Sequence, residues 1–157
     1  MSDDKHIAGV IAPPPLIFGI PLIVGLVIHG QDLGLDVTQD WPGRAIGGAI
    51  LTIFGAALIM LAILRFRAAG TPPEPWEETT AFVREGVYRL TRNPMYLGMA
   101  SIYAGITIIA GCFVLLALFV PVIITIHRGV ILREEQYLSR KFGAAYDEYC
   151  RSTRRWV

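Results

Sequence analysis

Arg92-Asn93-Pro94-Met95-Tyr96-Leu97-Gly98 is the stretch around which the chain is organised. It opens directly into a long apolar run that ends at Ile126, so it lies where a membrane helix meets water. Charged and hydrogen-bonding side chains in such a position are costly to keep unless they bind something. We therefore expect this stretch to help hold a cofactor, and the C-terminal segment 133–157 to fold over it.

The composition is typical of a membrane protein. The 157 residues, about one domain, are 54% hydrophobic and 17% charged, with a mean hydropathy of +0.51, whereas soluble domains carry about 25% charged residues. A net charge of +1 and no basic cluster with interleaved aromatic residues indicate no nucleic-acid partner. Cys112 and Cys150 form neither a disulfide framework nor a metal-ligand spacing, so we expect two unpaired thiols and no metal.

Four apolar segments are candidates for transmembrane helices, because about 20 apolar residues in a helix cross a bilayer core. We expect spans at about residues 11–30, 42–64, 94–110 and 112–132. The last two share one apolar run, which a hairpin at Gly111-Cys112 divides. Glycines of the second span predict close packing on another helix, as small residues do in lipid: Gly43, Gly47, Gly48 and Gly55.

Basic residues indicate the orientation of these spans. Of 14 Lys plus Arg residues, only Arg44 lies on the side of the Asp-rich loop between the first two spans. The others lie in the N-terminus, in the middle loop 65–93, and in the tail 133–157 or, for Arg128, near the end of the span that leads into it. We therefore predict a single-domain, all-α integral membrane protein with four transmembrane helices, both termini in the cytoplasm, in the inner or plasma membrane of a bacterium or archaeon.

The tail is amphipathic, and Gly143 is expected to divide it in two. Its apolar residues recur at helical spacing, namely Leu138, Phe142, Ala145, Tyr146 and Tyr149. A helix of this kind can lie on the membrane surface, or it can cover a site at the cytoplasmic face. The two interpretations are compatible, and we expect the tail to cover the cofactor site.

Two adjacent carboxylates, Glu134 and Glu135, lie where the fourth expected span ends. Neighbouring residues of a helix point about 100° apart, so at most one of them faces a given pocket. The plain alternative to a functional site is a solvated helix turn, in which both glutamates form ion pairs with bases close in the sequence, such as Arg133 and Lys141. No catalytic triad, HExxH, CxxC or phosphate loop is present. The residues alone therefore lead to a polar site at the inner face of a membrane protein, and no further.

Two ordered motifs carry a resemblance to a known family. They are Gly86-Val-Tyr-Arg-Leu-Thr-Arg-Asn-Pro-Met-Tyr-Leu-Gly98 and Glu134-Glu135 followed by Leu138, Phe142-Gly143, Tyr146 and Tyr149. With them, the segment 70–157 resembles the isoprenylcysteine carboxyl methyltransferase family, which shares this C-terminal pattern with the phospholipid methyltransferases. The first two expected spans are similar in hydropathy only.

The resemblance implies that S-adenosylmethionine is the cofactor and that its methyl group passes to a lipid or small lipophilic acceptor at the cytoplasmic face. The acceptor would enter from the membrane lipids, and the cofactor would lie between the middle-loop motif and the C-terminal helices. The implied cofactor-binding residues are Arg92, Asn93, Pro94, Tyr96, Gly98, Glu135, Tyr146 and Tyr149. The implied catalytic residues are Glu134, Glu135 and Arg155, with a glutamate binding the cofactor's ammonium or orienting the acceptor, and the arginine steering the acceptor or a carboxylate.

The chain departs from the family pattern in two places. Asn93 stands where prenylcysteine enzymes often carry histidine, and the tail lacks the proline that often precedes the terminal arginine, so both Arg154 and Arg155 are candidates for it. An amine, phenol or thiol acceptor must also lose a proton, for which the two glutamates are the nearest bases. The alternatives are a nicotinamide-dependent membrane reductase of the sterol reductase type, a four-span transporter and a non-catalytic membrane protein.

Overall fold

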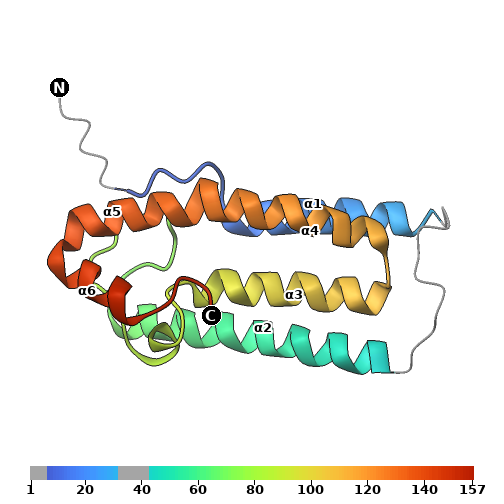
Figure 1. Ribbon diagram of the computed structural model, residues 1–157, viewed down its shortest axis with the longest axis horizontal. Helices are drawn as coiled ribbons and strands as arrows, with labels where there is room; N and C mark the ends of the chain where they lie inside the picture. Colours follow the sequence, from blue (N-terminus) through green and yellow to red (C-terminus); the bar gives the residue numbers. More distant parts are fainter. Residues whose placement is uncertain (1–6, 32–42) are drawn as a thin grey trace.

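The computed structural model describes residues 7–31 and 43–157, and the regular elements in these ranges are helices (Figure 1). They are α1 (Pro14–His29), α2 (Gly43–Ala68), the 3₁₀-helix η1 (Gly86–Arg89), α3 (Pro94–Ala110), α4 (Phe113–Ile126), the π-helical turn η2 (His127–Ile131), α5 (Leu132–Phe142) and α6 (Ala144–Ser152). The elements α4, η2 and α5 follow one another without a break, as one helix Phe113–Phe142.

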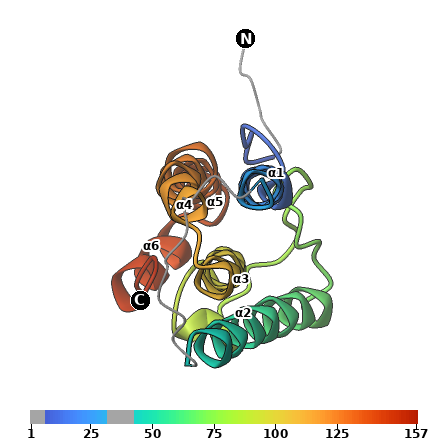
Figure 2. The same ribbon diagram turned by 90° about the vertical axis from the view of Figure 1, so that its right-hand side faces the viewer.

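Four apolar helices lie side by side, and α3 is in contact with each of the other three (Figures 1 and 2). Two helices, α2 and Phe113–Phe142, are long and apolar enough to cross a membrane, while α1 and α3 are shorter apolar helices. Many large hydrophobic side chains point outward, among them Ile23, Ile53 and Val120. An apolar exterior of this extent is unusual for a protein surrounded by water.

The expected breaks between helices are confirmed. Helix α3 ends at Ala110, Gly111 adopts a left-handed conformation with φ 64°, and α4 begins at Phe113. Helix α5 ends at Phe142, and Gly143, with φ 54°, separates it from α6. Glycine takes these conformations without the cost that a Cβ would add.

Helices α2 and α3 approach each other through glycines on both sides. A Cβ placed on Gly98 of α3 would lie 2.6 Å from the carbonyl oxygen of Gly55, and one on Gly48 of α2 would lie 2.6 Å from the carbonyl oxygen of Gly105. Close helix packing, predicted from the glycines of the second span, is therefore confirmed at Gly48 and Gly55. Gly47 takes no part, since nothing lies within 4 Å of a Cβ built there.

One end of the bundle collects the polar segments 69–93 and 133–157 together with the N-terminal residues 7–13, and we call it the polar end (Figure 1). The N-terminal segment follows the long helix there: Ile11 N donates to Gly129 O at 3.2 Å, and Arg133 Nη1 donates to Gly9 O at 2.8 Å. Gly129 belongs to the π-helical turn, a feature often found near functional sites. The hydropathy of the sequence carried no signal of this turn, which directly precedes the two adjacent glutamates.

Candidate functional site

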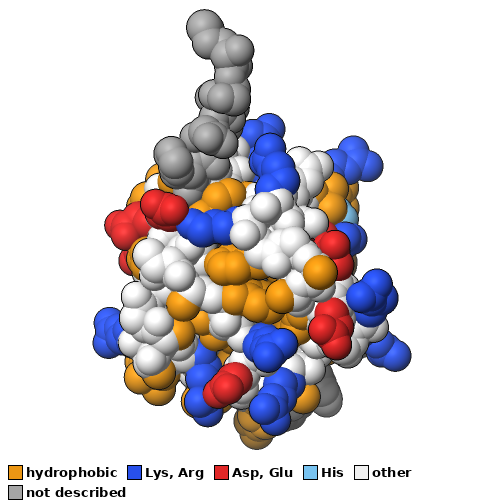
Figure 3. Space-filling view, turned by 90° about the vertical axis from the view of Figure 1, so that its left-hand side faces the viewer, with side chains coloured by type: hydrophobic (Ala, Val, Ile, Leu, Met, Phe, Trp, Pro, Cys, Tyr) orange, Lys and Arg blue, Asp and Glu red, His pale blue; other side chains and the backbone are white. Residues whose placement is uncertain are grey.

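The polar end contains a cavity bounded by the segment 72–83, the beginning of α3, and helices α5 and α6. Its empty volume is about 820 Å³, a figure that includes open solvent at its mouth. In Figure 3, which faces this end, hydrophobic side chains lie at the centre and charged side chains surround them. Its aromatic lining consists of Phe66, Phe82, Tyr88, Tyr96, Tyr137, Tyr146 and Tyr149.

Two carboxylates line this cavity, Glu74 of the loop and Glu134 of α5, and Glu134 is bound to the first motif. The hydroxyl of Tyr96 donates to Glu134 Oε1 at 2.6 Å. Burial raises the pKa of Glu134 to about 7, against the lowering effect of the Tyr96 hydrogen bond and with a smaller raising effect from the charge of Glu135. Glu134 lies beyond the apolar part of the long helix, and near neutral pH its carboxyl group can either hold or release a proton.

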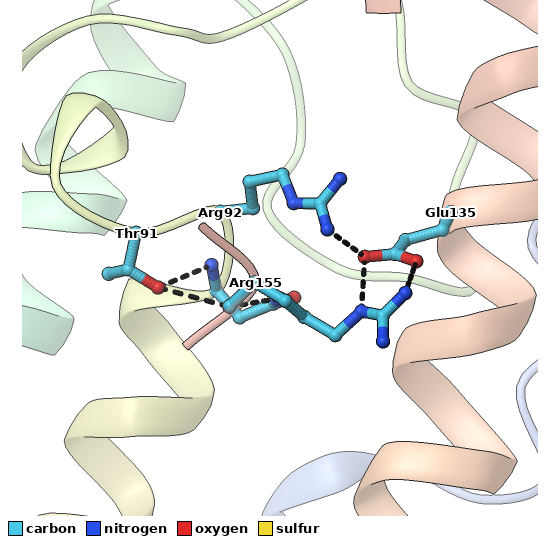
Figure 4. Close-up of polar contacts among 5 residues, drawn as sticks. Thr91, Arg92, Glu135 and Arg155 are labelled. Carbon is cyan, nitrogen blue, oxygen red and sulfur yellow. Dashed lines mark hydrogen bonds and ion pairs between the residues drawn. The ribbon is translucent and has the colours of Figure 1, made fainter. Parts of the chain in front are cut away.

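Glu135 does not line this cavity, and it is held by two arginines that are distant in the sequence (Figure 4). Arg155 donates from Nε to Oε1 at 2.8 Å and from Nη2 to Oε2 at 2.7 Å, while Arg92 Nη2 lies 3.1 Å from Oε1. The bases close in the sequence have other partners, because Arg133 binds Gly9 O and Lys141 binds Glu78. The solvated helix turn, which was the plain alternative, is therefore wrong for Glu135.

The C-terminal residues 153–157, which we call the C-terminal arm, lie beside the segment that leads into α3. Arg92 N donates to Arg154 O at 2.9 Å. The carbonyl oxygen of Arg155 accepts from Thr91 Oγ1 at 3.1 Å and from Asn93 Nδ2 at 2.8 Å (Figure 4). The side-chain amide of Asn93 therefore anchors the arm, although this residue also lines the cavity.

An aromatic cluster forms the wall opposite α3. Phe82 stacks on Phe142 at 5.3 Å between ring centroids and makes edge contacts with Tyr146 and Tyr149. The hydroxyl of Tyr149 donates to Tyr88 O at 2.5 Å. Burial raises the pKa of both Tyr146 and Tyr149, so their hydroxyls remain protonated and the wall uncharged.

The structure brings most of the expected cofactor-binding residues to the cavity: Arg92, Asn93, Pro94, Tyr96, Tyr146 and Tyr149 line it. Gly98 does not, because it lies one turn further along α3, against Gly55 of α2. Its place in the motif is explained by helix packing rather than by a ligand. Glu135 and Arg155 lie on the far side of Arg92 and line no part of the cavity.

Sequence reasoning missed part of the lining. Tyr88 lies within the first motif but was given no role, and the periodicity of α5 placed no emphasis on Tyr137, whose hydroxyl accepts from Thr79 N at 3.3 Å. Phe82 lies in a segment without helical periodicity, and nothing in the sequence pointed to it. Within the described residues, no group of three or more His, Cys, Asp or Glu could hold a metal ion.

The structure thus combines apolar helices, of the kind found in membrane proteins, with an aromatic cavity at their polar end. The chain belongs to the phospholipid methyltransferase family, which it matches over residues 44–145, from the first turn of α2 to the first turn of α6. The family membership expected from the two motifs is thereby confirmed. No curated protein and no solved structure gave a match to the chain.

Proposed function

We propose that the protein transfers the methyl group of S-adenosylmethionine to a lipid or small lipophilic acceptor, at the cytoplasmic face of a membrane that four of its helices cross. Membership of the phospholipid methyltransferase family supports methyl transfer over the reductase, the transporter and the non-catalytic alternatives. The observation that carries the choice of donor is a buried polar atom beside the cavity. Arg92 Nε is buried and has no hydrogen-bond partner among the described residues.

The residues around the cavity fit the chemical groups of this donor. An unpartnered guanidinium nitrogen suits a carboxylate, and the buried rings of Tyr146 and Tyr149 suit an aromatic base. The carboxyl group of Glu134 and the face of Tyr96 suit a cationic centre. S-adenosylmethionine combines a carboxylate, an adenine ring and two cationic centres in one molecule.

When bound, S-adenosylmethionine supplies a methyl group that is already activated by its sulfonium. The protein then has to hold donor and acceptor in line and keep water away, and positioning of this kind can lower a barrier by about 7–11 kcal/mol. Phe82 and the tyrosines around it separate the cavity from water on one side. Glu134 is placed to take a proton from an acceptor that must lose one.

The apolar surfaces of the helices support an acceptor that comes from the lipid. Exposed hydrophobic residues such as Ile20 and Ile50 cover the outer faces of α1 and α2, and an amphiphile in the same leaflet would meet the polar end without crossing water. The arginines concentrate at that end, whereas Arg44 lies at the opposite end of α2. Basic residues favour the cytoplasmic side, which supports placing the cavity there.

Calorimetry on the purified protein in nanodiscs tests the donor. We expect S-adenosylhomocysteine, the demethylated product, to bind the wild type, and incubation with methyl-labelled S-adenosylmethionine and bacterial lipid extract to give a labelled lipophilic product. NADPH serves as the control ligand and should not bind. Folded protein that takes up NADPH but neither S-adenosylmethionine nor its product would overturn the proposal.

A further inference from the structure

We infer that Arg155 is a positioning residue: through Glu135 it holds Arg92 in the orientation that binds the carboxylate of the methyl donor. The inference rests on the proposed function and assigns a part of the donor to a part of the site. It differs from the roles expected from the sequence, in which Arg155 steers the acceptor or a carboxylate, and Glu134 or Glu135 binds the donor's ammonium or orients the acceptor.

Both oxygens of Glu135 are engaged by arginines. Arg155 occupies both of its oxygens with a pair of charge-assisted hydrogen bonds, and Oε1 also receives Arg92 Nη2 (Figure 4). Bidentate pairs of this kind fix direction as well as distance. The exposed fractions of the Glu135 and Arg92 side chains are only 16% and 11%, so water competes little for these bonds. Glu135 therefore acts on the guanidinium of Arg92 and not on a ligand.

The group has one positive charge that no described carboxylate pairs with. It contains two guanidinium groups, Arg92 and Arg155, and one carboxylate, Glu135. The side chain of Arg155 is 36% exposed, whereas that of Arg92 is 11% exposed, and a buried charge is costly unless it is paired. The buried Nε of Arg92 lacks a partner among the described residues, and Arg92 lines the cavity. An anion bound beside Arg92 would supply the missing partner of its guanidinium group. The only anionic group of the donor is its carboxylate.

Arg155 is fixed to the segment that bears Arg92 at both its backbone and its side chain. Its carbonyl oxygen accepts from Thr91 Oγ1 and Asn93 Nδ2, the two neighbours of Arg92. The next residue, Trp156, packs against the hydrophobic core. Anchored in this way, the side chain of Arg155 reaches Glu135 and does not reach the cavity, whose lining does not include it.

Two ligands, one with the donor's carboxylate and one without it, distinguish a positioning role of Arg155 from a general structural role. S-adenosylhomocysteine carries the amino-acid end, and methylthioadenosine keeps the adenosine and the sulfur but lacks that end. We expect Arg155→Ala to weaken S-adenosylhomocysteine binding about tenfold, since a hydrogen bond to a charged group contributes about 1.5–3 kcal/mol, and to leave methylthioadenosine binding unchanged. Arg155→Lys keeps the positive charge but cannot form the two parallel hydrogen bonds of a guanidinium. We therefore expect a smaller loss of S-adenosylhomocysteine affinity in this variant.

Arg154→Ala is the matched control, because it removes the same charge from the neighbouring residue of the arm, whose side chain is exposed. It should bind both ligands as the wild type does, and unfolding curves of each variant show whether the fold is kept. If Arg155→Ala unfolds, the test uses Arg155→Lys instead, and its affinity for S-adenosylhomocysteine is compared with its affinity for methylthioadenosine. Equal weakening of both ligands, or no weakening of either, overturns the inference while the proposed function stands. Wild-type protein that binds neither ligand overturns the proposed function, and the inference with it.

Discussion

The apolar half of the bundle and the polar end are held together by different contacts. In the apolar half, the backbones of α2 and α3 meet where Gly55 faces Gly98, with no polar side chain at that contact. At the polar end, hydrogen bonds and ion pairs join residues far apart in the sequence, such as Arg155 and Glu135. We therefore expect the first region to determine whether the helices assemble, and the second to determine what the assembled protein binds. Substitutions in the two regions should therefore separate stability from activity.

The largest effect is expected from Gly55→Val. The new side chain would meet the carbonyl of Gly98 and the side chain of Ile102, and overpacking of a close contact costs about 1–3 kcal/mol, or more where backbone has to move. We expect the free energy of unfolding, measured by SDS titration in mixed micelles, to fall by about 3 kcal/mol.

Gly47→Val is the control on the same helix, because a side chain there meets open space. It should change the free energy of unfolding by about 0.5 kcal/mol or less, as surface substitutions usually do. Equal losses in the two variants would mean that the valine, and not the contact with α3, is responsible, and the distinction between the two regions would lose its structural basis.

The second effect concerns Glu134, on the cavity side of α5. Glu134→Gln keeps the size of the side chain and its contact with Tyr96 but removes the proton acceptor. For an amine, phenol or thiol acceptor we expect turnover to fall about 100-fold, within the usual range for general-base catalysis, while cooperative unfolding shows that the fold is kept. Glu148→Gln, an equal charge change on the exposed face of α6, should retain wild-type turnover. Wild-type turnover in Glu134→Gln with such an acceptor would remove Glu134 from the mechanism.

The pH dependence of turnover sharpens the same point. Because burial raises the pKa of Glu134 to about 7, the carboxylate form gains population as pH rises, so the rate should increase about tenfold per unit below pH 7 and level off above it. The stability change has the opposite sign, since a carboxyl pKa raised by folding favours the protonated folded state, which loses stability between about pH 4.5 and 7. A carboxylate acceptor needs no base, and with it the pH profile and the Glu134→Gln variant should both be flat.

Local sequence signals were sufficient for the boundaries of several helices. Pro94 begins α3, Gly111 turns the chain, and Gly143 divides the tail, because each of these residues acts through its own backbone preferences. The rule that adjacent helical residues point apart was also confirmed, with Glu134 facing the cavity and Glu135 the arginines. Each of these predictions depended only on the sequence within a few residues of the position concerned.

The polar end could be predicted only in part, because its contacts depend on how distant segments fold back. The motif placed Arg92 and Asn93 at the site, but nothing local shows that Asn93 binds the carbonyl of Arg155. The stacking of Phe82 on Phe142 likewise joins a loop to a helix. A resemblance to a family indicates which positions of this chain belong to a site. It does not show which residue each of them contacts, and that requires the three-dimensional structure of both segments.

The smallest effect is expected from Lys141→Ala, which removes the ion pair that links α5 to the loop bearing Phe82. Lys141 Nζ lies 2.6 Å from Glu78 Oε1, and the two side chains are 26% and 54% exposed. Ion pairs this exposed contribute about 0–1 kcal/mol, and the Debye length falls from about 10 Å at 0.1 M salt to about 3 Å at 1 M. We expect a loss of unfolding free energy below about 1 kcal/mol that vanishes at high salt, and unchanged S-adenosylhomocysteine affinity. Arg140→Ala, whose Nε binds Gln136 O on its own helix, is the matched control. A loss of 2 kcal/mol or more in Lys141→Ala alone would show that charge, rather than the aromatic stack on Phe142, holds this loop over the cavity.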